Sequence, residues 1–224
     1  MNISIIIPTL NESENIISIL DCLQDMRKRG HEVILVDGGS NDDTVSLASD
    51  LCDLVVNSKK GRAIQMSTGA SRASGDVLWF LHADSIVDKD CDRKILDGLA
   101  RSGKVWGRFD VSISGNHLLL GVISMMMNLR SRITGISTGD QGIFVLKTIY
   151  HVTGGFQEMA LMEDIEFSKR MKLRSFPLCL QEKITTSGRR WESKGIIRTI
   201  WLMWKLRLLY AFGAKPEILS RMYT

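Results

Sequence analysis

The sequence predicts an α/β fold with a doubly wound sheet, and three observations support this prediction. The segment Ile3–Ile7 consists of isoleucines except for Ser4 and is ended by Pro8, which is typical of a strand buried on both faces of a parallel sheet. Strand and helix patterns then alternate four times within about eighty residues, as in doubly wound sheets. No Gly/Ser linker, internal repeat or second core pattern follows, so we expect one domain.

The elements can be placed in order along the chain. After the first strand, apolar residues recur at helical spacing from Ile16 to Leu23, with Ser13 as the expected cap and Gly30 as the stop. Further strands are predicted at 33–36, 54–56, 77–81, 105–113 and 142–146, and further helices at 42–52, 62–73, 89–101 and 117–130. The second half is expected to extend the same sheet. Residues 191–224 form a C-terminal helical appendage of the domain that spans 1–190.

Composition excludes several classes of protein. With 44% hydrophobic and 24% charged residues and three prolines, the chain is neither disordered nor of low complexity. The longest apolar stretch, Leu118–Met127, is interrupted and falls short of the roughly 20 residues of a membrane span.

The N-terminus lacks a signal-peptide pattern, so we expect a cytoplasmic protein. The four cysteines include no Cys-x-x-Cys pair, which favours reduced, buried thiols over a zinc site or disulfides.

Charge is distributed unevenly along the chain. Residues 1–164 contain 16 basic and 21 acidic side chains, whereas residues 165–224 contain 13 and 4. In the segment Gly195–Gly213 the basic residues stand among isoleucines, leucines and tryptophans, which resembles an interfacial helix more than a nucleic-acid-binding arm. We therefore expect no nucleic acid partner. This helix is either buried against the sheet or a partner subunit, or it lies on the inner face of the cell membrane.

Polar residues follow the predicted strands at the points where each strand ends. In an open α/β sheet the ligand binds beyond the carboxyl ends of the strands. No Gly-x-Gly-x-x-Gly follows the first strand and no P-loop lysine motif is present, which counts against a dinucleotide fold and a P-loop NTPase.

Six motifs stand in the order of a known family. They are IIIPTLNE at Ile5–Glu12, VDGGSNDDT at Val36–Thr44, GRAIQMSTGA at Gly61–Ala70, FLHADS at Phe80–Ser85, TGDQGIFV at Thr138–Val145 and GGFQEMALMEDIEFSKRMK at Gly154–Lys172. With them the chain resembles the family 2 glycosyltransferases from Ile3 to about Phe212. The resemblance implies the GT-A fold, a mostly parallel sheet flanked by helices, and an inverting, bacterial-type enzyme.

The resemblance also implies where a nucleotide sugar, of the UDP or GDP type, would bind. The donor-binding candidates are Pro8, Thr9, Asn11, Glu12, Asp37, Gly38, Arg62, His82, Ala83 and Asp84. A carboxylate such as Asp37 can accept a hydrogen bond from a uracil imide or a ribose hydroxyl. Alternatively, Asp37 only caps the next helix, and Arg62 is an exposed surface residue rather than a phosphate ligand.

His82-Ala83-Asp84 occupies the position of the family's Asp-x-Asp motif, which holds a divalent cation, Mn²⁺ or Mg²⁺. Asp84 retains the hard carboxylate ligand, whereas His82 replaces the first Asp. His82 is therefore a metal ligand that favours Mn²⁺, or it contacts the donor sugar or phosphate without binding metal.

The catalytic candidates are Asp164, as general base, and Glu163, which supports it. Inverting sugar transfer requires an acceptor hydroxyl to lose its proton as it attacks the anomeric carbon. The alternative is that both carboxylates only complement a helix dipole.

The acceptor-side candidates implied by the resemblance are Gly139, Asp140, Gln141, Arg190 and Trp191. Ser187 stands where processive synthases of the family carry Gln or Arg, which favours a non-processive enzyme. The preferred function is transfer of one sugar to a hydroxyl acceptor, with lipid-linked acceptors among the candidates. A nucleotidyltransferase and a non-catalytic membrane-surface binding module are the alternatives.

Overall fold

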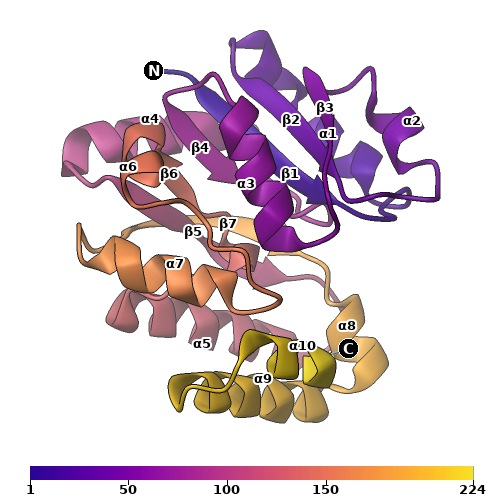
Figure 1. The fold of residues 1–224 in the computed structure, drawn as a ribbon, viewed down its shortest axis with the longest axis vertical. Coiled ribbons are helices and arrows are strands. Elements are labelled where there is room, and N and C mark those ends of the chain that lie inside the picture. Colours follow the sequence, from indigo (N-terminus) through magenta and orange to yellow (C-terminus); the bar gives the residue numbers. More distant parts are fainter. Residues whose placement is uncertain (224) are drawn as a thin grey trace.

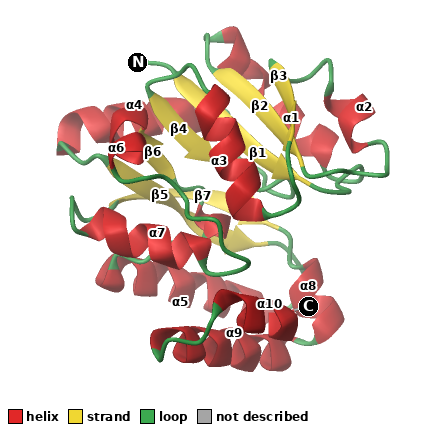
Figure 2. Ribbon diagram, in the orientation of Figure 1, coloured by secondary structure: helices red, strands yellow, loops and turns green. Residues whose placement is uncertain are grey.

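The computed structural model describes residues 1–223. The helices and strands alternate as the sequence predicts over most of the chain (Figures 1 and 2). In chain order the elements are β1 (Ile3–Thr9), α1 (Ile16–Lys28), β2 (Glu32–Asp37), α2 (Thr44–Ala48), β3 (Leu54–Asn57), α3 (Arg62–Arg72), β4 (Val77–Phe80), α4 (Cys91–Ser102), β5 (Trp106–Ile113), α5 (Leu118–Thr134), the 3₁₀ helix η1 (Gly139–Gln141), β6 (Phe144–Leu146), α6 (Lys147–Val152), α7 (Glu163–Lys172), β7 (Leu178–Thr186), α8 (Arg189–Lys194), α9 (Ile196–Ala211) and α10 (Pro216–Tyr223).

A seven-stranded sheet in the order β3-β2-β1-β4-β6-β5-β7 forms the centre of the molecule. Strand β6 runs antiparallel to β4 and β5, and the other pairs are parallel. The register pairs Thr9 with Asp37 and Ile6 with Phe80. The carboxyl ends of β1, β2 and β4 therefore lie together at one edge of the sheet.

Both faces of the sheet are covered because the strand residues on both faces are apolar. Ile5 and Ile7 belong to a core with α1, α2 and α4, whereas Ile6, between them, belongs to a core with α3, α6 and α7. This alternation follows from the two-residue period of a strand. Successive apolar residues such as Ile5, Ile6 and Ile7 are therefore required in the same strand.

The C-terminal helices α8, α9 and α10 lie beside α5 and α7 at one end of the molecule (Figure 1). Leu206 of α9 and Leu219 of α10 pack on Met162 and Ile165 at the start of α7. The appendage thus has an apolar contact with the segment that carries the predicted general base. The predicted division of the chain at residue 190 remains a prediction.

The structure corrects several boundaries. Helix α1 begins at Ile16 after Asn15, and no side chain caps it, so the predicted cap at Ser13 is wrong. Residues 42–52 contain only the short helix α2, because Asp42 holds the Thr44 amide and hydroxyl in a turn before it. The sequence analysis did not identify β7, α6 or α10. The strand at 105–113 and its place in the same sheet are confirmed.

The described cysteines are all free, and Cys52 and Cys91 are buried, whereas Cys22 and Cys179 are only partly buried. Within residues 1–223 we find no helix of the length and apolarity needed to cross a bilayer.

Candidate active site

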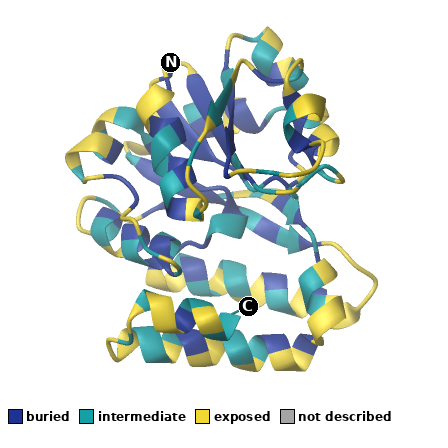
Figure 3. Cartoon of the chain, turned by 45° about the vertical axis from the view of Figure 1, so that its right-hand side comes forward, coloured by how far each residue is buried: buried dark blue, intermediate teal, exposed yellow. Residues whose placement is uncertain are grey.

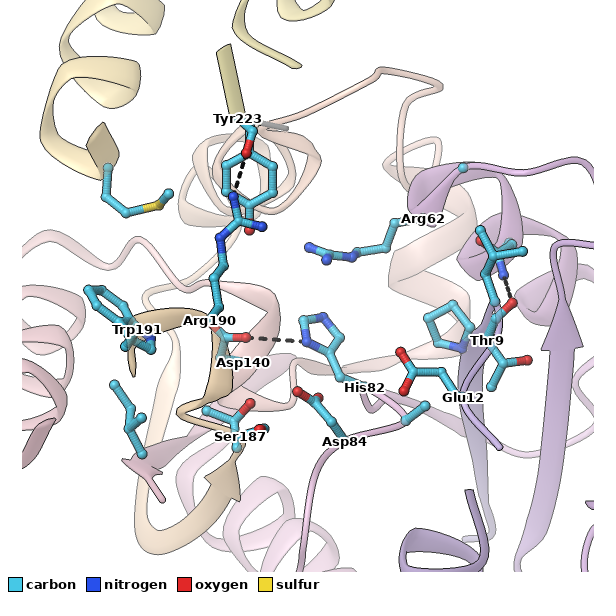
Figure 4. A pocket seen from close by; sticks show the side chains of 18 of the residues that line it. Thr9, Glu12, Arg62, His82, Asp84, Asp140, Ser187, Arg190, Trp191 and Tyr223 are labelled. Atoms are coloured by element: carbon cyan, nitrogen blue, oxygen red, sulfur yellow. Dashed lines mark hydrogen bonds and ion pairs between the residues drawn. The ribbon is translucent and has the colours of Figure 1, made fainter. Parts of the chain in front are cut away.

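A cavity of about 430 Å³ opens at the carboxyl edge of the sheet (Figure 4). The predicted site residues that line it are Pro8, Thr9, Glu12, Arg62, His82, Ala83, Asp84, Asp140, Arg190 and Trp191. A second, smaller cavity of about 110 Å³ shares Arg62, His82 and Asp140 with the first, and it also contacts Gly139, Glu163 and Asp164. The structure thus brings residues from five separate motifs of the sequence around two adjoining cavities.

The loop after β1 is held by the loop after β2. Asn11 adopts a positive φ of 53°, its side chain accepts a hydrogen bond from the Asn41 amide at 2.9 Å, and its own amide donates to Ser40 at 2.9 Å. Asp37 accepts hydrogen bonds from the amides of Gly39 and Ser40, both at 2.9 Å, and from the Ser40 hydroxyl. Asn11 and Asp37 line neither cavity, although Leu10 and Glu12 on either side of Asn11 line the larger one.

Gly38 and Gln141 also lie behind the cavity lining. A Cβ on Gly38 would come within 3.0 Å of the Gln65 side chain, which ties β1 to β2 by donating to Thr9 O and Val36 O. Gln141 is fully buried and forms a reciprocal capping box with Thr138 that fixes η1. Both predicted residues therefore support the site from outside the cavity.

His82 is held from two sides. Its Nδ1 lies 3.3 Å from Asp140 Oδ1, and its Nε2 is buried without a hydrogen-bond partner among the described residues. The position of a Cβ on Gly139 lies 2.5 Å from that Nε2, so the imidazole packs directly on the Gly139 backbone. A glycine is required at 139 for this contact.

Asp84 provides the open carboxylate of the cavity. An antiparallel bridge between Ile86 and Thr185 of β7 anchors its loop, with N···O distances of 2.8 and 3.0 Å. Within residues 1–223 no group of three His, Cys, Asp or Glu side chains is arranged to hold a cation. Asp84 still fits one as a hard oxygen ligand, provided that phosphate and water oxygens complete the coordination, as is usual for Mg²⁺. His82 fits less well because one nitrogen faces Asp140 and the other faces Gly139.

Glu163 and Asp164 begin α7 at the floor of the smaller cavity. Asp164 accepts hydrogen bonds from the Gly139 amide at 3.0 Å and from the Ile165 amide at 2.7 Å, which fixes its carboxylate. Glu163 is buried, and Arg62 lies 3.6 Å from it. Burial, together with the charge of Asp164, raises the pKa of Glu163 against the effect of Arg62.

The C-terminal appendage forms one wall of the cavity. Arg190 stacks on the Tyr223 ring, 3.6 Å from its centroid, and also donates to the Tyr223 carbonyl (Figure 4). Trp191 lines the same wall.

Sequence reasoning missed Tyr223, Met203 and Arg207, which line one or both cavities from α10 and α9. One signal was available for Arg207. At 100° per residue it lies about half a turn away from Arg198 and Lys205, which indicates that it faces a different side of the helix from these two basic residues. No comparable pattern in the sequence indicated that Tyr223 lines the cavities.

Comparison with known proteins identifies the class and the family. The model for glycosyl transferase family 2 matches residues 4–163, and the chain belongs to this family. Poly-beta-1,6-N-acetyl-D-glucosamine synthase of Staphylococcus aureus (strain COL) is 25% identical over 243 residues, which cover 99% of this chain and 57% of that protein. The chain thus spans little more than half the length of this curated relative.

Two solved structures have a similar fold. S. aureus TarS 1-349 in complex with UDP-GlcNAc matches with a TM-score of 0.69 and 20% identity over 84% of this chain and 58% of that one. Mannosyltransferase PcManGT from Pyrobaculum calidifontis, in complex with GDP-Man and Mn²⁺, matches with a TM-score of 0.69 and 17% identity over 99% of this chain and 68% of that one. The predicted GT-A fold is confirmed.

Proposed function

We propose that this glycosyltransferase moves a single sugar, with inversion, from a nucleoside diphosphate sugar to a hydroxyl acceptor. The observation that carries the proposal is the fixed carboxylate of Asp164 in the smaller cavity, which shares Arg62, His82 and Asp140 with the larger one. The larger cavity takes the donor and the smaller one takes the acceptor hydroxyl. Structural neighbours in complex with UDP-GlcNAc and GDP-Man support a donor of the UDP or GDP type.

In this proposal Asp164 is the general base. The acceptor oxygen bonds to the anomeric carbon as the bond from that carbon to the diphosphate oxygen breaks, and the hydroxyl proton passes to Asp164. A single displacement of this kind inverts the anomeric centre. The backbone amides of Gly139 and Ile165 hold the Asp164 carboxylate in place for this role, and Glu163, beside Arg62, supports it.

The leaving diphosphate needs positive charge around it. Arg62 and Arg190 line the larger cavity and would contact the phosphates. A divalent cation held by Asp84 would neutralise the charge that develops on the leaving group. The Mn²⁺ in the PcManGT complex supports this assignment. His82, buried against Gly139, would orient Asp140 and contact the donor, and its role as a ligand remains a prediction.

Asp140, which lines both cavities, and Trp191, which lines the larger one with Ser187, are proposed to contact the part of the acceptor that extends out of the smaller cavity. Ser187 in place of a longer polar residue is the basis for proposing single rather than repeated transfer.

We also propose that the protein contacts an anionic membrane surface. Helix α9 exposes Ile197, Trp201, Trp204 and Leu208 along one face (Figure 3). Residues 165–224 contain 13 basic and 4 acidic side chains, and tryptophans flanked by basic residues suit the lipid interface. Such contact would present the active site to a lipid-linked acceptor.

The test separates donor binding from turnover. We expect Asp84→Ala to weaken Mn²⁺-dependent binding of UDP or GDP in a thermal-shift assay. We expect Asp164→Asn to retain that binding and to release sugar from the donor about 100-fold more slowly, the scale of general base catalysis. The exposed Asp43, which makes no cap hydrogen bond, provides the control variant Asp43→Ala. Near-normal sugar release by Asp164→Asn would refute the base assignment.

A further inference from the structure

Two arginines near Asp164 have no counter-ion in contact. Arg130 lies on α5, and its Nε and Nη2 atoms are buried without a hydrogen-bond partner within residues 1–223. Arg207 lies on α9 and lines the smaller cavity together with Asp164. Both residues are only partly exposed, and removing a cation from water is costly unless an anion accompanies it.

The nearby carboxylates have other partners. Glu163 faces Arg62 at 3.6 Å, Asp140 faces His82 at 3.3 Å, and both oxygens of Asp164 accept backbone amides. The negative charges of Asp164 and Asp140 act on Arg207 and Arg130 through space. No described carboxylate, however, lies within ion-pair distance of either guanidinium.

The two guanidiniums also repel each other. Burial, and then the positive charge of Arg207, lower the pKa of Arg130 to about 10. Burial likewise lowers the pKa of Arg207, although Asp164 and Asp140 act in the opposite direction. A negatively charged group beside Arg207 in the smaller cavity would offset these unfavourable effects, and a guanidinium suits such a group because it can donate two parallel hydrogen bonds to it.

The location of the pair indicates which molecule would supply that anion. Arg62, Asp84 and Arg190 line the larger cavity, where the donor diphosphate is proposed to bind. Arg207 lines only the smaller cavity, beyond His82 and next to the proposed base. Its volume of about 110 Å³ is far below the roughly 300 Å³ of a pocket for a whole small ligand, so it suits one small charged group.

We propose that Arg207, with the charge of Arg130 behind it, binds a phosphate or carboxylate group of the acceptor and thereby sets the neighbouring hydroxyl against Asp164. This inference rests on the proposed function and names the acceptor class as anionic. Leu161, Met162 and Leu206 line the same cavity, so the part of the acceptor next to its charge meets apolar side chains. A soluble phosphorylated or carboxylated sugar acceptor and a lipid phosphate share this chemistry.

The test measures anion binding in the full chain with the donor site filled. Inorganic phosphate is titrated by calorimetry into protein saturated with Mn²⁺ and with UDP or GDP, whichever gives the larger thermal shift. We expect saturable binding that Arg207→Gln weakens about tenfold or more and Arg207→Lys weakens less, because a lysine keeps the charge and loses the bidentate geometry. Arg198→Gln, at an exposed position on the same helix, serves as the matched control and should bind phosphate as the wild type does.

Each result has a distinct meaning. Phosphate binding that is absent in the wild type, or unchanged in Arg207→Gln, would overturn the inference. Failure of UDP and GDP to bind would instead overturn the proposed function, and the nucleotide titration reports it separately. We expect Arg207→Gln without phosphate to melt at or above the wild-type temperature, since it removes an uncompensated charge, whereas a purely structural arginine would lower the melting temperature.

Two further titrations identify the source of the anion. Acetate in place of phosphate reports whether a carboxylate suffices. Vesicles of phosphatidylcholine with 20% dioleoyl phosphatidic acid, compared with inorganic phosphate at equal phosphate concentration, separate a lipid phosphate from a soluble one.

Discussion

His31 shows how a buried titratable side chain couples the fold to pH. It is 8% exposed, and its Nδ1 accepts a hydrogen bond from the Ile3 amide at 3.2 Å while its Nε2 lies 3.0 Å from Asp92. Protonation of Nδ1 would abolish the bond to the first strand. Burial lowers the pKa of His31, and the charge of Asp92 only partly opposes this. Although burial acts to raise the pKa of Asp92, the hydrogen bond from Arg29 leaves it lowered.

We expect the free energy of unfolding to decrease as the pH falls below about 6.5. The unfolded chain protonates His31 at that pH, whereas the folded chain does so only at a lower pH, so acid favours the unfolded state. Asp92 adds a second loss in more acidic solution, because its stabilisation is present above its unfolded pKa and is lost as the pH falls through its folded pKa. Urea unfolding at pH 7.5, 6.5 and 5.5 measures the first effect.

The variant His31→Gln should flatten this pH dependence, while His151→Gln, at an exposed position, should preserve it. If His31→Gln unfolds with the same pH dependence as the wild type, another group accounts for the acid sensitivity.

Among the residues that line the cavities, those that directly follow a buried strand could be predicted from the sequence. Asp84 and Glu12 could be placed because they follow buried strands, and the ends of parallel strands share one edge. Arg207 and Tyr223 are more than forty residues after Asp164 and reach the cavity only because α9 and α10 fold back onto α7. That contact depends on three-dimensional packing, which no local pattern encodes.

Helix α3 lies close to the sheet because Gly69 has no side chain. A Cβ at this position would come within 2.5 Å of Ile6 Cγ2 and 2.9 Å of Val36 Cγ2, both on buried strands. Helix α5 contains Gly121, where a Cβ would meet no atom within 4 Å. Substituting Gly69 by alanine therefore tests the packing of a helix on the sheet, whereas the same substitution at Gly121 tests helix propensity alone.

We expect Gly69→Ala to lower the free energy of unfolding and Gly121→Ala to raise it. Overpacking costs about 1–3 kcal/mol and exceeds the roughly 1 kcal/mol that alanine contributes to a helix interior, whereas Gly121→Ala gains that propensity alone. Urea unfolding of both variants measures the difference. Equal effects of the two substitutions would mean that α3 can shift away from the sheet without cost.

Among the elements, those with strong periodic patterns were predicted and those without were missed. The buried strands β1, β2 and β4 have continuous apolar runs, and α1 has a clear helical spacing. Strand β7 carries Gln181, Glu182 and Lys183 at its centre, because only parts of it face a core, so its pattern resembles a loop. Helix α2 was predicted too long because Asp42 favours a turn over a helix start.

At the scale of the whole molecule, exposed apolar side chains gather on two neighbouring helices. On α5 the exposed residues recur at helical spacing, and they are Leu118, Leu119, Val122, Met125, Met126, Leu129 and Ile133. Helices α5 and α9 pack on each other through Leu120, Ile123 and Ile196. Leu119 and Ile197 line one open cavity of about 660 Å³, so the two exposed faces meet there. We call this surface the α5–α9 face.

The α5–α9 face extends the membrane proposal beyond the single helix that the sequence indicated. Its apolar area is unusual for a surface exposed to water. Among the residues of α9, Arg198 and Lys205 lie beside the exposed tryptophans, as in helices that rest on anionic headgroups. A second copy of the chain is the competing occupant of the same face.

We expect the protein to co-sediment with liposomes that contain 30% phosphatidylserine at low salt, and less so at 0.5 M NaCl, because salt screens the basic side chains.

The double variant Trp201→Ser/Trp204→Ser removes two apolar side chains of α9. It should abolish co-sedimentation at both salt concentrations, since each aromatic side chain that enters the lipid contributes through its apolar area. The double variant Leu47→Ser/Leu54→Ser, at exposed positions on α2 and β3, controls for the loss of surface apolar residues. A protein that stays in the supernatant at low salt and elutes as a dimer in size-exclusion chromatography, with the tryptophan variant eluting as a monomer, would assign the α5–α9 face to a second copy and overturn the membrane proposal.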